Sequence, residues 1–181
     1  MGAVRHWWRI EMRKTLRIVS DATHPLPIQD LDIQRLRLRS ELFGSAFVLV
    51  QHLGRRMDAL LASMDLTTRQ WLLLAVLSKA GRPLSLSDAA AAYGSSRQNI
   101  KEIALGLERR GFLRLATDPT DARALLLHPT PLVAQTFDTP EAQAQGADFL
   151  AGIFAGCSPT DLADLHRLLL AWLRSLTEVP R

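Results

Sequence analysis

GSSRQNIKEIALGLERRGF, residues 94–112, has apolar residues at steps of three and four. This spacing predicts an α-helix with one buried side, formed by Ile100, Ile103, Ala104 and Leu107. The opposite side of the helical wheel is mainly polar and includes Ser95, Gln98, Lys101, Glu102, Leu105 and Arg109. Gly94 ends the preceding element, Ser95 or Ser96 can cap the helix, and Gly111 can end it. We therefore expect a short helix with a core face and an outer face suited to hydrogen bonding.

The neighbouring segments predict a winged helix-turn-helix. SLSDAAAAYG, residues 85–94, predicts a helix of barely two turns with Ser85 or Ser87 as its cap. Two helices joined across about four residues, with Gly94 in the turn, have helix-turn-helix spacing. The following runs FLRLA and RALLLH flank the turn residues TDPTDA, which predicts a β-hairpin in the position of a wing. Arg82, Pro83 and Leu84 are read as a simple connection.

Long helices are predicted on both sides of this region. Residues 34–63 form one long helix with more apolar positions than one face needs, which implies a partner helix. RQWLLLAVLSKAG, ending at Gly81, predicts a buried helix. After Thr130 the chain turns helical again, Pro140 kinks or breaks it, and Ser158, Pro159 and Asp161 begin a last helix.

Composition excludes several classes of protein. The 181 residues are 48% hydrophobic, enough for a sizeable core, and carry a net charge of +4. Residues 42–137 contain eleven Lys and Arg against seven Asp and Glu, which gives weak support to a polyanion partner. The single cysteine, Cys157, rules out an intramolecular disulfide and favours a cytoplasmic location. No run approaches the roughly 18 apolar residues of a membrane span.

The chain resembles the MarR (multiple antibiotic resistance regulator) family of winged helix-turn-helix transcription factors from about Leu66 to Leu127. The motifs that carry the resemblance are Leu66-Thr67 with Gln70, Ser96-Arg97-Gln98, Leu107-Glu108, Gly111, and Asp118-Pro119 with Asp121 and Arg123. It implies a mainly α fold with a small β-hairpin wing, in which N- and C-terminal helices form a homodimer. The expected segments are an N-terminal extension (1–33), a dimerisation helix (34–63), the DNA-binding region (64–129) and C-terminal dimerisation helices (130–181).

The resemblance also implies a function. Such proteins bind double-stranded DNA, with recognition helices in successive major grooves, and most are repressors released by a small ligand. By position, the DNA-contacting residues would be Ser95, Ser96, Arg97, Gln98, Asn99, Lys101 and, in the wing, Arg123. Gln and Asn can read adenine, and Arg can read guanine or phosphate. The wing departs from the family in having Thr120 and Ala122 where further basic residues are common, and HPTPLV replaces the family's usual segment after the wing.

Two further features leave alternatives open. His52 and Trp71 lie on helices that border the ligand crevice in the family, where an apolar or aromatic acid would bind, yet a lone His or Trp on such helices is more often a core residue. Cys157 lies between C-terminal helices rather than near the N-terminal helix, so we expect a partly buried structural thiol rather than a peroxide sensor.

Other classes of function find less support. The histidines and carboxylates are not spaced as metal ligands, so we expect no bound metal or cofactor. The sequence shows no phosphate-binding loop, no nucleophile elbow and no carboxylate pair placed for acid-base catalysis, so we do not expect an enzyme. Residues 5–19 have a basic and apolar pattern that also suits a membrane-surface helix, but docking on the protein is the preferred reading and no membrane partner is expected. The alternative function is a winged-helix adaptor for proteins that has lost DNA binding, which the sparse wing and the outward Glu102 favour.

Overall fold

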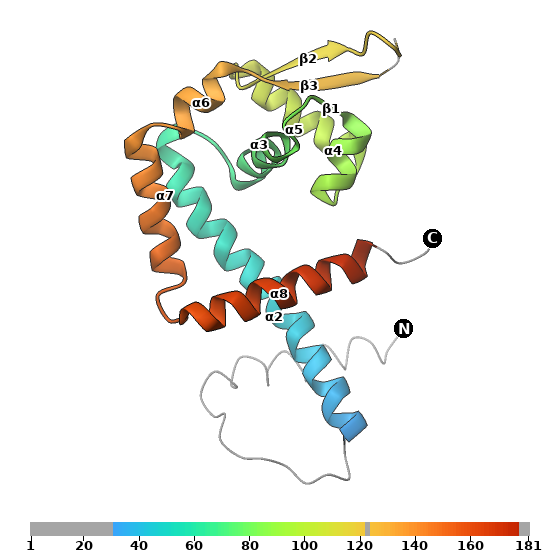
Figure 1. Cartoon of the computed structure of the whole chain (residues 1–181). Coiled ribbons are helices and arrows are strands. Elements are labelled where there is room, and N and C mark those ends of the chain that lie inside the picture. Colours follow the sequence, from blue (N-terminus) through green and yellow to red (C-terminus); the bar gives the residue numbers. More distant parts are fainter. Residues whose placement is uncertain (1–30, 122–123, 178–181) are drawn as a thin grey trace. The chain divides into compact units, whose positions relative to one another are not determined.

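The computed structural model describes residues 31–121 and 124–177, and it is mainly helical with one small antiparallel sheet (Figure 1). The helices are α2 (Leu31–Leu61), η3 (Ala62–Met64), α3 (Thr68–Ala80), α4 (Leu86–Tyr93), α5 (Arg97–Arg109), α6 (Pro131–Phe137), α7 (Pro140–Ile153) and α8 (Pro159–Thr177). The strands are β1 (Leu84–Ser85), β2 (Leu113–Thr117) and β3 (Leu125–Pro129). This confirms the predicted fold class. The chain divides into two compact units, with the boundary between Trp71 and Leu72, inside α3.

In the first unit, α2 is joined to the start of α3 by a side-chain brace. The chain leaves η3 through Asp65, whose φ of 51° lies in the left-handed region. One carboxylate oxygen of Asp58 accepts hydrogen bonds from both the backbone N–H and the hydroxyl of Thr68, each at 2.7 Å. Thr67 and Gln70 add reciprocal hydrogen bonds of the capping-box type. These hydrogen bonds cap the start of α3.

The second unit holds a compact apolar core around the helix-turn-helix. The buried side chains come from α3, α4, α5, all three strands and the turn before β2: Leu73, Leu74, Leu77, Leu84, Leu86, Ala89, Ala90, Ile100, Ile103, Ala104, Leu107, Phe112, Leu113 and Leu127. Among the described residues, no polar or charged side chain is buried. Since the core fixes α5 through one face only, its other face is left for contacts outside this unit.

The helix ends are set by the residues that the sequence predicts. Ser85 caps α4 by accepting from the Asp88 N–H at 3.1 Å, and Ser96 caps α5. Gly94 and Gly111 adopt φ angles of 75° and 79°, which side chains with a Cβ rarely adopt. These two glycines therefore fix the turn between α4 and α5 and the exit from α5 to the sheet.

The sheet contains one strand more than predicted. Its order is β1-β3-β2, with both pairs antiparallel. The hairpin β2–β3 confirms the predicted wing, but the segment read as a connection contains β1, where Leu84 pairs with Leu127 and Ser85 with Leu126. A strand of two residues has no periodicity of its own, and it exists here because β3 supplies its hydrogen-bonding edge.

Beyond the wing, three helices follow, and the predicted interruption at Pro140 is confirmed as a complete break. Thr130 caps α6 and donates its hydroxyl proton to the Gly111 carbonyl at 2.6 Å. Thr139 caps α7, whose first residue is Pro140. Ser158 and Asp161 form the predicted capping box at the start of α8. Within the described parts of the chain, no single helix is long and apolar enough to cross a membrane.

Candidate nucleic-acid interface

The outer face of α5 is the candidate interface. Ile100, Ala104 and Leu107 are completely buried and Ile103 is 8% exposed, which fixes the rotation of the helix. Arg97, Gln98 and Lys101 are exposed, as the helical periodicity predicts. The arrangement presents two cations and an amide on a rigid element. These are the groups that can contact phosphates and base edges.

The first turn of α5 is held by hydrogen bonds among its own residues. Ser96 Oγ accepts from the Asn99 backbone N–H at 3.2 Å, and Asn99 Nδ2 donates to Ser95 Oγ at 2.6 Å. Ser95 and Asn99 are half-buried. Of the predicted contact residues, Ser95, Ser96 and Asn99 therefore have a structural task in this turn. Arg97, Gln98 and Lys101 extend from it.

Gln98 has a partner that the sequence analysis did not assign. Its Nε2 donates to Glu102 Oε1 at 2.9 Å, one helical turn along the same exposed face. The spacing of four residues between an amide and a carboxylate is the signal that could have revealed this pair. Glu102, which the sequence analysis placed on the outer face of the helix, thus also orients the Gln98 amide.

The wing is attached to α5 and has a defined turn. Glu108 Oε1 accepts from the Leu115 backbone N–H in β2 at 2.8 Å. In the turn, Asp118 Oδ1 accepts from both the hydroxyl and the N–H of Thr120, at 2.7 Å each, and these hydrogen bonds lower the pKa of the Asp118 carboxyl. Arg123, the predicted wing contact, lies outside the described residues.

The other candidate residues lie on separate elements. His52 is exposed on α2, with its Nδ1 atom 3.4 Å from a guanidinium nitrogen of Arg55, and Trp71 is half-buried in α3. Cys157 is exposed, so the expectation of a partly buried thiol is wrong. It lies in the short connection between the end of α7 at Ile153 and the start of α8 at Pro159. In the described ranges, no three His, Cys, Asp or Glu side chains are grouped so that they could hold a metal ion.

A capped helix-turn-helix followed by a hairpin on the same core defines a winged helix-turn-helix protein. Residues 64–124 match the model of the MarR family. The match covers the winged helix-turn-helix region, and together with the solved structures below it supports a transcriptional regulator of the MarR family. No curated protein sequence matches the chain.

Solved structures of the same architecture cover most of the chain. The MarR protein from Peptoclostridium difficile DA00132 is similar over 87% of this chain and 95% of its own, with 15% identity and a TM-score of 0.68. A probable transcriptional regulator from Pseudomonas aeruginosa is 26% identical over 70% of this chain and 95% of its own, with a TM-score of 0.57. Reduced AbfR bound to DNA is 20% identical over 82% of this chain and 99% of its own, with a TM-score of 0.56.

Proposed function

We propose that the protein binds a pseudo-palindromic DNA operator as a homodimer and represses transcription until a small apolar or aromatic ligand releases it. One observation carries the proposal: α5 buries its apolar stripe and exposes Arg97, Gln98 and Lys101 on the opposite side. AbfR, which shares the fold, was solved bound to DNA. A helix held in this way can enter a major groove with its polar face toward the bases.

The three exposed side chains suggest separate tasks. Gln98 is neutral, so its contribution must come from hydrogen bonds to base edges rather than from charge. Lys101 is a flexible cation, which suits a phosphate contact that releases counterions. Arg97 can form bidentate hydrogen bonds with guanine or with phosphate. In this proposal Gln98 contributes selectivity and Lys101 contributes affinity for any duplex.

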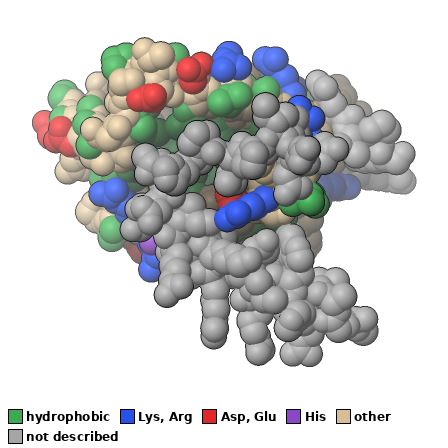
Figure 2. All heavy atoms as spheres, turned by 90° about the horizontal axis from the view of Figure 1, so that it is seen from below, with side chains coloured by type: hydrophobic (Ala, Val, Ile, Leu, Met, Phe, Trp, Pro, Cys, Tyr) green, Lys and Arg blue, Asp and Glu red, His purple; other side chains and the backbone are tan. Residues whose placement is uncertain are grey.

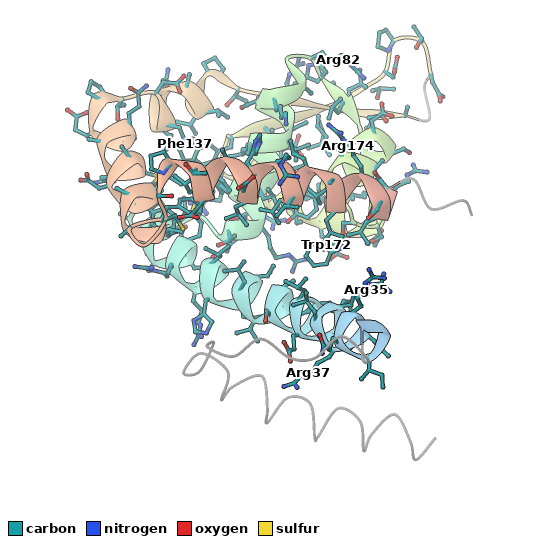
Figure 3. The ribbon with its side chains drawn as sticks, turned by 60° about the horizontal axis from the view of Figure 1, so that its bottom comes forward. Arg35, Arg37, Arg82, Phe137, Trp172 and Arg174 are labelled. Atoms are coloured by element: carbon teal, nitrogen blue, oxygen red, sulfur yellow. The ribbon has the colours of Figure 1, made fainter. Side chains whose placement is uncertain are left out.

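Exposed apolar side chains on α2 and α8 support the homodimer. On α2 they are Ile33, Leu36, Leu38, Leu42, Phe43, Phe47, Leu49 and Val50, and on α8 they are Leu162, Leu165, Leu168, Leu169, Leu170, Trp172, Leu173 and Leu176. In Figure 2, hydrophobic side chains are visible at the surface among polar and charged ones, and Figure 3 shows Trp172 and Arg174 on α8. Large apolar side chains exposed in such number on a helix favour association with a second copy. Two copies would read half-sites about one helical turn apart, roughly 10 bp.

Ligand control rests on family membership and on the aromatic side chain of Trp71. If an apolar or aromatic acid binds beside Trp71 or His52, tryptophan fluorescence changes and DNA affinity falls. The coupling must be reciprocal, so saturating operator DNA lowers the affinity for the ligand by the same factor. A compound that binds without changing operator affinity would argue against this form of control.

Selection of genomic fragments by the purified protein tests the proposal. Enrichment of sites with two related half-sites, with affinity that falls steeply as salt increases, is the expected result. Failure to retain any duplex at low salt, with the fold intact, would overturn DNA binding. Capture of a specific protein by the same face would then favour the adaptor function.

A further inference from the structure

We infer that Glu102 determines base preference: with Gln98 it forms an acceptor pair that selects a base carrying an exocyclic amino group in the major groove, cytosine foremost. The inference rests on the proposed DNA-binding function and adds the identity of the base that α5 prefers. The two side chains are called the acceptor pair below.

The geometry of the acceptor pair fixes the orientation of the Gln98 amide. Both side chains are exposed, and Gln98 Nε2 donates to Glu102 Oε1 at 2.9 Å. A carboxylate can only accept hydrogen bonds, so the amide must turn its NH2 group toward Glu102. The free Oε1 of Gln98 and the second oxygen of Glu102 therefore remain as acceptors on the outer face of the helix.

This orientation changes what Gln98 can read. Bidentate recognition of adenine by Gln needs both the carbonyl and the NH2 group on the same base edge. Because Glu102 competes for the NH2 group, the acceptor pair is better matched to a single strong donor. In the major groove, cytosine N4 and adenine N6 are the donors, and carboxylates pair with cytosine N4.

The negative charge adds discrimination against other bases. Guanine presents O6 and N7 as acceptors, and thymine presents O4, so either would place lone pairs against the carboxylate. The Glu102 carboxylate also repels the DNA phosphates, which weakens binding. A hydrogen bond from a donor on a base edge to this carboxylate would offset that repulsion. Repulsion of wrong bases is a common source of specificity.

Operator selection with Glu102→Gln tests the inference. The substitution keeps the shape of the side chain but introduces an NH2 donor, so we expect the cytosine preference at one position of each half-site to fall about tenfold, the magnitude of about 1.4 kcal/mol. Glu141→Gln is the matched control, because it makes the same charge change at an exposed site on α7. The control is expected to keep the wild-type base preference. Thermal melting shows whether each variant is folded.

Each outcome has a separate meaning. If Glu102→Gln selects the same bases as the wild type while both bind selectively, the inference is wrong and the proposed function stands. If the wild type itself enriches no sequence, both fail. A uniform change in affinity without a change in base preference would assign Glu102 a purely electrostatic effect and would also overturn the inference.

Discussion

The Glu108 carboxylate of α5 accepts a hydrogen bond from the backbone N–H of Leu115 in β2, with the two atoms 2.8 Å apart. This bond joins the last turn of the candidate recognition helix to the first strand of the wing. Leu115 faces Leu127 across the hairpin, so the bond acts on both strands of the wing. The position of the wing relative to α5 therefore depends on a side chain as well as on the core.

Replacement of Glu108 tests this link. Glu108→Ala leaves the half-buried N–H of Leu115 without its acceptor, so the free energy of unfolding is expected to fall by about 1 to 3 kcal/mol. Glu108→Gln keeps an acceptor oxygen and is expected to lose less. Urea unfolding of both variants measures the difference. Equal stability of wild type and the alanine variant would show that the bond contributes nothing.

A second prediction concerns pH and the brace between Asp58 and Thr68. The Thr68 backbone N–H, and secondly its hydroxyl, hold the pKa of the Asp58 carboxyl below its ordinary value. Because the folded pKa is lower than the unfolded one, the stabilisation is complete above the unfolded pKa, roughly pH 4, and is lost as pH falls through the folded pKa.

The stability difference between the wild type and Asp58→Asn is therefore expected to narrow as pH is lowered from about 5 to 2. Asp148→Asn serves as the control, because Asp148 is exposed on α7. Chemical unfolding at a series of pH values gives the curves. A stability difference that stays constant across this pH range would show that the charge of Asp58 does not stabilise the fold.

A third prediction separates backbone strain from packing. Gly94 has φ 75° and open space around an added Cβ, so Gly94→Ala is expected to destabilise the protein by about 1–2 kcal/mol through strain alone. Gly146 also has open space but lies within α7, where Ala is expected to stabilise by about 0.5–1 kcal/mol. Thermal unfolding of the two variants shows whether each substitution lowers or raises the stability of the fold. A gain in stability from Gly94→Ala would contradict the assigned turn geometry.

A fourth prediction concerns assembly. At micromolar concentration, sedimentation equilibrium is expected to give twice the chain mass of 20.1 kDa. Leu168→Glu places a charge on the exposed apolar side of α8 and is expected to shift the equilibrium toward monomer. Arg167→Ala, at the neighbouring exposed position, is expected to leave the dimer intact. A wild-type monomer would exclude a stable homodimer.

Local signals predict most of this fold. The caps at Ser85, Ser96 and Ser158 and the stops at Gly94 and Gly111 depend on bonds and angles within a few residues, so the sequence contains them. The break at Pro140 is predictable for the same reason. In contrast, β1 depends on pairing with β3, some 40 residues away in the chain, and two residues carry too little pattern to reveal it.

The site was only partly predictable. Helical periodicity identifies Arg97, Gln98 and Lys101 as exposed, because the buried stripe fixes the rotation of α5. Two hydrogen bonds depend on side-chain rotamers, which the residue spacing permits but does not determine. They join Gln98 to Glu102 and Glu108 to Leu115. Exposure of Cys157 depends on how the connection between α7 and α8 is covered, and its position between two helices does not determine that.

The most direct test of the central claim, that α5 reads DNA, compares Gln98→Ala with Lys101→Ala in salt-dependent binding to a selected operator and to random duplex. Gln98→Ala is expected to cost about 1–3 kcal/mol on the operator and little on random DNA. Lys101→Ala is expected to weaken both and to reduce the salt slope by about one. If both variants remain folded dimers and keep wild-type operator affinity and salt slope, α5 does not read DNA and the central claim is wrong.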